Sequence, residues 1–174
     1  MTTDVDEPLA RREETVAVIG FGNSFRRDDG VGPAVAAAIE ARAIPGVSVL
    51  TAASDPAVVL EAWAGVRLAV LIDAVVTTPC QPGRIHRCAM SELVGSPAVS
   101  SHGMDIATLL ALGEVLHRIP DDVVVFAVEV KETGYGVGLT PNVHAAVPLV
   151  VDAVMATIGP ETEGRQRSWA PTGS

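Results

Sequence analysis

Four side chains in three segments of this sequence are of the types that acid–base or metal chemistry needs. Asp28 and Asp29 follow an apolar run, Asp73 lies inside the apolar segment 71–76, and His102 precedes another apolar segment. A carboxylate in an apolar strand costs free energy unless it is paired, hydrogen-bonded or bound to a cation. Asp73 is therefore the strongest single indication of a functional site.

Two carboxylates and one imidazole that converge on one place suit a borderline divalent cation with open coordination positions. Zinc, nickel and cadmium fit this donor set, and magnesium fits it less well because of the nitrogen ligand. His102 precedes an expected helix, where a charged imidazole is disfavoured, so we expect it to be neutral and able to bind a metal. Each residue also has an ordinary interpretation: Asp28 or Asp29 as a helix cap, Asp73 bonded to loop amides, and His102 as a loop residue.

The elements that must position these residues follow from the hydrophobic pattern. We expect strands at about residues 15–20, 47–50, 68–76, 84–88 and 122–130, and helices at about 31–43, 55–64, 103–117 and 142–158. Pro148 lies inside the last helix, which either kinks there or begins there.

Strands that alternate with helices predict one α/β domain, with a twisted, mostly parallel five-stranded sheet and helices on both faces. Segment 84–88 alternates polar and apolar residues, which predicts one antiparallel edge strand. We expect it to pair with the strand before it, because the connection is too short for a crossover helix. Sites in such sheets lie beyond the carboxyl ends of the strands, where the acids and His102 would meet.

The composition narrows the class of protein. The chain has 174 residues, 48% hydrophobic but 3% aromatic, so we expect one domain with an aliphatic core at residues 14–159 and disordered tails at 1–13 and 160–174. A net charge of −9 argues against nucleic acid as a partner, and no apolar run approaches the roughly 18 residues of a membrane span. The N-terminus lacks a signal-peptide pattern, and Cys80 and Cys88 match no zinc or redox motif. We therefore expect a cytoplasmic protein with two free thiols and no membrane partner.

The glycine-rich segment 20–32 has one obvious alternative interpretation, a dinucleotide-binding turn. The third glycine of that motif would fall at position 25, which is Phe25, and no acidic residue that could bind a ribose follows the second strand directly. Two acids in the loop would also repel a pyrophosphate. A nucleotide-binding α/β module remains an alternative that dinucleotide binding would support.

The sequence resembles the hydrogenase maturation proteases in short motifs that occur in order along nearly the whole domain. The motifs are residues 20–32 (Gly-Phe-Gly-Asn-Ser-Phe-Arg-Arg-Asp-Asp-Gly-Val-Gly), 72–74 (Ile-Asp-Ala) followed by Pro82-Gly83, 101–103 (Ser-His-Gly) and 138–141 (Gly-Leu-Thr-Pro). Many members of that family carry Asp-Gly-Gly-Thr after the second strand, where this chain has Thr-Ala-Ala-Ser-Asp-Pro at 51–56.

The resemblance implies an endopeptidase that removes the C-terminal extension of a nickel-loaded nickel–iron hydrogenase large-subunit precursor. The family's metal-contacting residues correspond to Asp29, Asp73 and His102, which favours Asp29 over Asp28. We expect these three residues to recognise the nickel of the precursor. Alternatively they hold an ion of the enzyme's own, such as zinc or cadmium, or a carboxylate activates a water directly. A non-catalytic chaperone that only docks on the precursor is a further alternative.

The remaining acids and histidines carry weaker signals. Glu129, late in an apolar strand, is expected either to join the site or to cap the loop that contains Tyr135. We expect His86, His117 and His144 to have ordinary surface roles.

Overall fold

A computed structural model describes residues 16–52, 55–89 and 106–166. Its strands are β1 (Val16–Phe21), β2 (Val47–Ala52), β3 (Leu68–Val75), β4 (Ile85–Ala89) and β5 (Asp122–Glu129). Its helices are the 3-10 helix η1 (Arg27–Gly30), α1 (Val31–Glu40), α2 (Pro56–Ala62), α4 (Ile106–Val115) and α5 (Pro141–Gln166). The predicted alternation of strands and helices is confirmed.

The strands form one sheet in the order β2-β1-β3-β5-β4, in which β4 is the antiparallel edge strand. The fold class is thus as expected, but the partner of β4 is not, since β4 pairs with β5 and not with β3. Residues 76–84 cross the carboxyl end of β5, where the Gly83 N–H donates to the Glu129 carbonyl oxygen and the Glu129 N–H to that of Arg84, both at 2.8 Å. Most of β5 is buried, which suits an interior strand, whereas the half-exposed β4 suits the edge.

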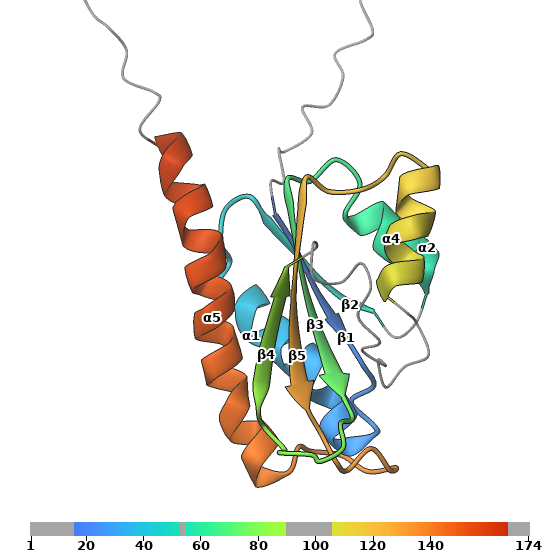
Figure 1. Cartoon of the computed structure of the whole chain (residues 1–174). Helices are drawn as coiled ribbons and strands as arrows, with labels where there is room; N and C mark the ends of the chain where they lie inside the picture. The colour runs from blue at the N-terminus through green and yellow to red at the C-terminus, as the bar shows by residue number, and fades with distance from the viewer. Residues whose placement is uncertain (1–15, 53–54, 90–105, 167–174) are drawn as a thin grey trace, which may run out of the picture.

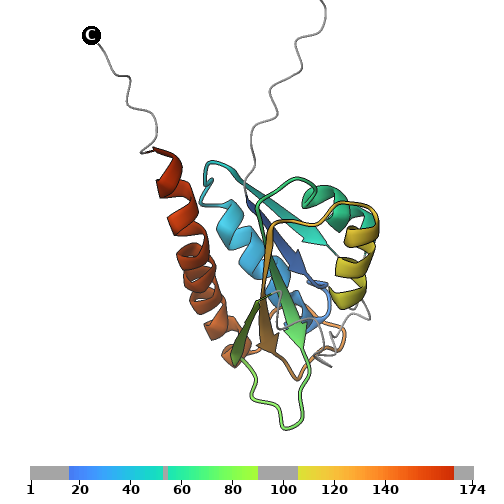
Figure 2. The ribbon, with the colours of Figure 1, turned by 45° about the horizontal axis from the view of Figure 1, so that its top comes forward.

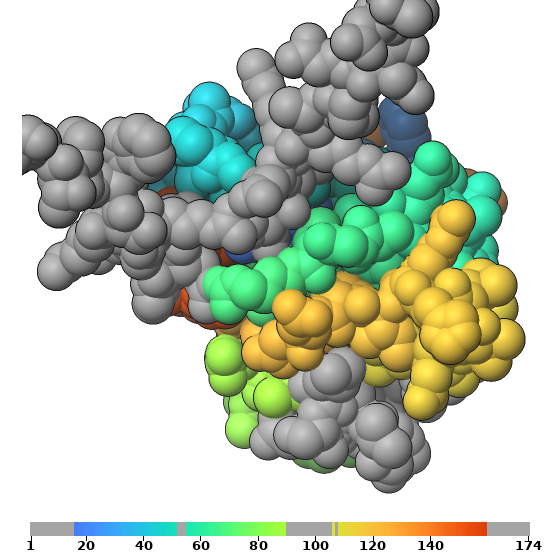
Figure 3. Space-filling model, turned by 90° about the horizontal axis from the view of Figure 1, so that it is seen from above, coloured from blue at the N-terminus to red at the C-terminus, as the bar shows by residue number. Residues whose placement is uncertain are grey.

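Helices cover both faces of the sheet, as predicted (Figures 1 and 2). Alternate residues of β3 point to opposite faces. Val70 packs in the core cluster beneath α1 and α5, and Leu71 packs in the cluster with Trp63 beneath α2 and α4. α2 and α4 adjoin each other in the view from above (Figure 3). Aliphatic side chains make up most of both clusters, in keeping with the low aromatic content.

α5 differs most from what the sequence predicts. It runs without a break from Pro141 through Pro148, so the alternative start at Pro148 is wrong. It also continues to Gln166, into the segment expected to be a tail, because the residues after Pro160 include glutamates, an arginine and a glutamine, which favour helices. The expected N-terminal tail at 1–13, like the last eight residues, falls outside the described part of the chain.

The first part of α5, Pro141–Gly159, is long and apolar enough to match a membrane-spanning helix by length and composition. The sequence predicted no such candidate here, because polar residues interrupt the apolar pattern of this segment. A helix that packs on a core meets the same criteria, and here the buried residues that face the sheet are Val143, Ala146, Val150, Val151, Val154 and Ile158. The apolar stripe of α5 is thus accounted for by packing against the sheet.

Candidate active site

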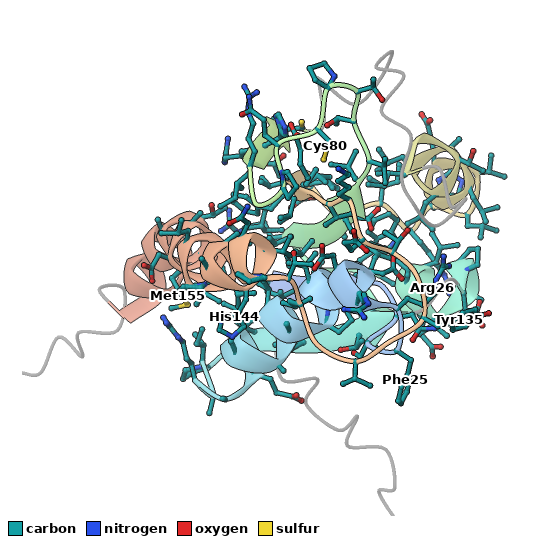
Figure 4. The ribbon with its side chains drawn as sticks, turned by 90° about the horizontal axis from the view of Figure 1, so that it is seen from below. Phe25, Arg26, Cys80, Tyr135, His144 and Met155 are labelled. Carbon is teal, nitrogen blue, oxygen red and sulfur yellow. The ribbon has the colours of Figure 1, made fainter. Side chains whose placement is uncertain are left out.

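All the buried acidic side chains of the described residues lie at one edge of the sheet. The carboxyl ends of β1, β3 and β5 meet there, at the bottom of Figure 1, and Figure 4 views this edge from below. The exposed fractions are 0% for Asp28, 1% for Asp29, 5% for Asp73 and 3% for Glu129. Such a concentration of buried charge marks this edge as the candidate active site.

The first turn of α1 lies directly on the ends of β1 and β3. A Cβ atom on Gly32 would overlap the backbone of Phe21 and lie 2.9 Å from the Ile72 carbonyl oxygen, and one on Gly20 would overlap the backbone of Gly32. Only glycine allows this approach, which brings η1 beside the end of β3 and therefore beside Asp73. These glycines are therefore required for the packing of α1 on the sheet.

Asp28 fastens the loop after β1 to the start of α5. The Thr140 N–H donates to Asp28 Oδ1 (2.6 Å) and the Thr140 hydroxyl donates to Oδ2 (2.9 Å). The Asp28 N–H donates in turn to the Glu132 carbonyl oxygen at 3.0 Å. The N-cap of α1 is Gly30, without a side-chain hydrogen bond, so neither acid caps that helix. Asp28 thus joins two loops that are 112 residues apart in sequence.

Asp29 and Asp73 come from two different segments, and a nearby backbone amide orients each of them. The Asn23 N–H donates to Asp29 Oδ2 at 3.0 Å, and the Ala74 N–H donates to Asp73 Oδ1 at 2.8 Å. Asp73 projects on the α2/α4 face, as Leu71 does, because strand residues two apart share a face. Two carboxylates are thereby held at the edge where the sequence predicted them.

The third predicted residue, His102, lies outside the described residues. Within the described ranges, no group of three or more His, Cys, Asp or Glu side chains could hold a metal ion. Asp29 and Asp73 supply two oxygen donors at this edge. A divalent centre of the predicted kind would need His102, ligands from a substrate, or both in addition.

Glu129 lies at the end of β5, on the same sheet face as Asp73. Its Oε2 accepts hydrogen bonds from the Gln81 N–H (2.6 Å) and the Thr77 hydroxyl (2.8 Å), and its Oε1 lies 2.7 Å from His86 Nε2. The Gln81 amide, then His86 and Thr77, lower the pKa of Glu129 from 4.5 to about 2. Glu129 is therefore an anion at neutral pH, and it holds the β3–β4 connection against β5.

Two of the weaker predictions are corrected by this arrangement. Glu129 does not cap the Tyr135 loop, because its hydrogen bonds reach residues 77–86 on the other side of β5. His86 is half-buried against Glu129 and has more than a surface role. The β4–β5 register, with His86 opposite Ala127, brings these two side chains together, so the expected pairing of β4 with β3 concealed their contact.

The other minor predictions agree with the structure. Cys80 and Cys88 are free thiols. His117 and His144 are exposed. None of these four side chains contributes to the buried acidic edge.

Comparison with known proteins identifies the family. The family described as hydrogenase maturation protease matches residues 33–157. Hydrogenase maturating endopeptidase HybD from Escherichia coli has a similar structure, with a TM-score of 0.74 and 21% identity over 84% of this chain and 93% of that one. The nickel–iron hydrogenase maturation protease HybD from Thermococcus kodakarensis has a TM-score of 0.68 and 24% identity over 82% of this chain and 97% of that one. No curated protein matches in sequence.

The family match covers well over half of the chain, and the fold of this sheet and its helices is that of the solved maturation endopeptidases. No finding supports a nucleotide-binding module. The chain therefore belongs to the hydrogenase maturation protease family and is an endopeptidase that processes a hydrogenase large subunit.

Proposed function

We propose that this endopeptidase removes the C-terminal extension of a nickel-loaded large-subunit precursor, and that Asp29, Asp73 and His102 form its active site. The observation that carries the proposal is the burial of Asp29 and Asp73, from two separate segments, at the carboxyl edge of the sheet. Buried carboxylates that meet at the carboxyl edge of a parallel sheet are candidates for function.

The nickel in this proposal belongs to the substrate. A metal already bound in the precursor brings ligands of its own, so the enzyme needs to supply few more. Two carboxylates and one imidazole suit such a borderline ion. The ion would supply Lewis-acid polarisation of a nearby carbonyl when the precursor is bound. Metal insertion would thereby be a checkpoint for cleavage, since a precursor without nickel would lack the group that these residues recognise.

The proton transfer of hydrolysis falls to the carboxylates of this chain. An ionised carboxylate beside the scissile bond can accept the proton of the attacking water and return it to the leaving amine. The Asn23 and Ala74 amides orient Asp29 and Asp73 for such a role, since each fixes one oxygen and thereby the plane of the carboxylate. Asp28 is excluded from this role, because Thr140 occupies both of its oxygens.

We place the reaction in the cytoplasm, a proposal supported by the two free thiols, because disulfides predominate in oxidising compartments. Fractionation of cells that express the full chain would test it.

Intact mass spectrometry of a nickel-loaded precursor incubated with the protein tests the proposed function. We expect the loss of one C-terminal fragment with the wild type, and no loss with Asp29→Ala, Asp73→Ala or His102→Ala, or when the precursor lacks nickel. Asp28→Asn is the matched control and should retain cleavage. Wild-type protein that binds the precursor but leaves it intact would favour the chaperone alternative. Stoichiometric metal retained by the free enzyme through chelation would contradict recognition of the precursor's nickel.

A further inference from the structure

The loops beside the candidate active site expose apolar side chains. Phe25 is 71% exposed, Tyr135 93% and Val137 81%. The chain has six aromatic residues, and the other aromatics among the described residues, Phe21, Trp63 and Phe126, are buried. A group of exposed apolar side chains on a soluble protein often marks an interaction surface.

The two loops that carry these side chains are bonded to each other. The Gly136 N–H donates to the Phe25 carbonyl oxygen and the Arg27 N–H donates to the Gly136 carbonyl oxygen, both at 2.9 Å. Arg26 Nε adds a bond of 3.1 Å to the Thr133 carbonyl oxygen. The exposed side chains therefore stand on a fixed backbone, which lowers the entropy that binding would cost. We call Phe25, Tyr135 and Val137 the apolar ledge.

The apolar ledge is continuous with the active site. Asp29 and Phe25 belong to one short turn, in which the Asp29 N–H donates to the Arg26 carbonyl oxygen at 3.1 Å and the Phe25 N–H donates to Asn23 Oδ1 at 2.9 Å. Figure 4 shows Phe25, Arg26 and Tyr135 on one side of the molecule, pointing outward, with Cys80 on the other side of the same edge. A polypeptide cleaved beside Asp29 must pass within a few residues of the ledge.

The charge around the ledge differs from that of the whole chain. The net charge of the protein is −9, yet residues 25–27 and 131–137, which carry the ledge, include the exposed Arg26, Arg27 and Lys131 and one exposed acid, Glu132. This combination of aromatic anchors and arginines is typical of the centre of protein interfaces. It suits a polypeptide segment in which apolar side chains lie next to acidic ones.

We propose that the apolar ledge is the surface on which the hydrogenase large-subunit precursor docks, through a segment of the precursor that carries apolar and acidic side chains. Docking of that segment holds the scissile bond at Asp29. This inference rests on the proposed function for the identity of the partner. The ledge supplies binding energy and the carboxylates supply the chemistry. Changes to the ledge therefore affect precursor affinity and leave the turnover of bound precursor unchanged.

The test compares Phe25→Ser/Tyr135→Ser with the wild type and with Val115→Ser, a matched control whose side chain on α4 is 76% exposed. Precursor affinity is measured by biolayer interferometry, and KM and kcat by mass spectrometry of cleavage. We expect the double variant to raise Kd and KM by about 10- to 100-fold with kcat within about 2-fold of the wild type, as for loss of two interface anchors. Val115→Ser should match the wild type, and all three should melt at the same temperature.

The outcomes separate this inference from the proposed function. Cleavage by the wild type, with unchanged KM and Kd in the double variant, would overturn the docking surface and leave the function standing. Binding without cleavage by the wild type, weakened in the double variant, would overturn the function and keep the docking surface. A wild-type dimer that the double variant converts to monomer, with KM unchanged, would reassign the ledge to self-association and overturn the inference. Lys131→Glu should weaken precursor binding and reduce its salt dependence.

Discussion

Two groups of buried carboxylates lie at the same edge of the sheet, yet their surroundings differ. Glu129 accepts hydrogen bonds from Thr77 and Gln81 in the β3–β4 connection and from His86 in β4, between 43 and 52 residues earlier in the chain. Asp29 and Asp73, beside β1 and β3, are each oriented by an amide within six residues. The first arrangement uses a charge to hold two segments together, and the second presents two charges from separate segments at one place.

This difference shows that burial of a carboxylate does not by itself identify a catalytic group. Glu129 is as buried as Asp73 and lies on the same face, but its hydrogen-bond donors stabilise its charge and lower its pKa to about 2. A group that remains an anion at every physiological pH is a poor proton carrier. We therefore assign a structural role to Glu129 and a catalytic role to Asp29 and Asp73. Isosteric substitutions at Glu129 and Asp73 can test this assignment.

The largest expected effect is on activity, from Asp73→Asn. The amide keeps the acceptor for the Ala74 N–H but removes the charge, so precursor cleavage should fall at least about 100-fold while the melting temperature holds or rises. Single-turnover cleavage followed by mass spectrometry measures the cleavage rate, and differential scanning calorimetry measures the melting temperature. Cleavage within tenfold of the wild type would remove Asp73 from the catalytic group.

Glu129→Gln should show the opposite pattern. An amide has no charge, and with its oxygen in the place of Oε2 it presents an NH2 group to His86, so the bonds from Gln81 and Thr77 lose their charge assistance and the His86 Nε2–H loses its acceptor. We expect a lower urea midpoint with an unchanged m value, and a much smaller loss of cleavage at 25 °C than in Asp73→Asn. Unchanged stability with abolished cleavage would return Glu129 to the active site.

The pH dependence of stability sharpens the same contrast. The pKa of Glu129 is lower in the folded state than its ordinary value of 4.5, so its contribution is fully present above pH 4.5 and is lost as the pH falls toward 2. The stability difference between the wild type and Glu129→Gln should therefore shrink over that window. Urea unfolding of both proteins at several pH values would measure it, and a constant difference would contradict the assigned pKa.

The smallest effect is expected for Cys80→Ala, in the same connection that Glu129 fastens. The Cys80 thiol is a weak donor to the Val130 carbonyl oxygen at 3.4 Å, so its removal should cost less than about 1 kcal/mol and leave cleavage unchanged. Urea unfolding and the cleavage assay would both report it. A loss of stability as large as that of Glu129→Gln would mean that the thiol shares the role given to Glu129.

The local pattern of residues was enough to predict the elements and the principal candidates. Hydrophobic periodicity predicted each strand and each α-helix, though not the short 3-10 helix η1, because burial on one face or on both imposes a spacing along the chain. The charge at Asp73 stood out because its neighbours are apolar, and the pair at 28–29 because it follows a buried strand. The alternation of strands and helices predicted a mostly parallel sheet, and a parallel sheet places these acids at one edge.

Contacts between residues far apart in sequence required the tertiary structure. Thr140 donates a hydrogen bond to Asp28 from 112 positions away in the sequence. The sequence of two adjacent aspartates does not show which of them makes this contact. The place of β5 between β3 and β4, which brings His86 to Glu129, depends on which strand buries more surface when the sheet assembles. Hydrophobic spacing records which face of an element is buried, whereas the partner that buries it is decided only when the whole chain packs together.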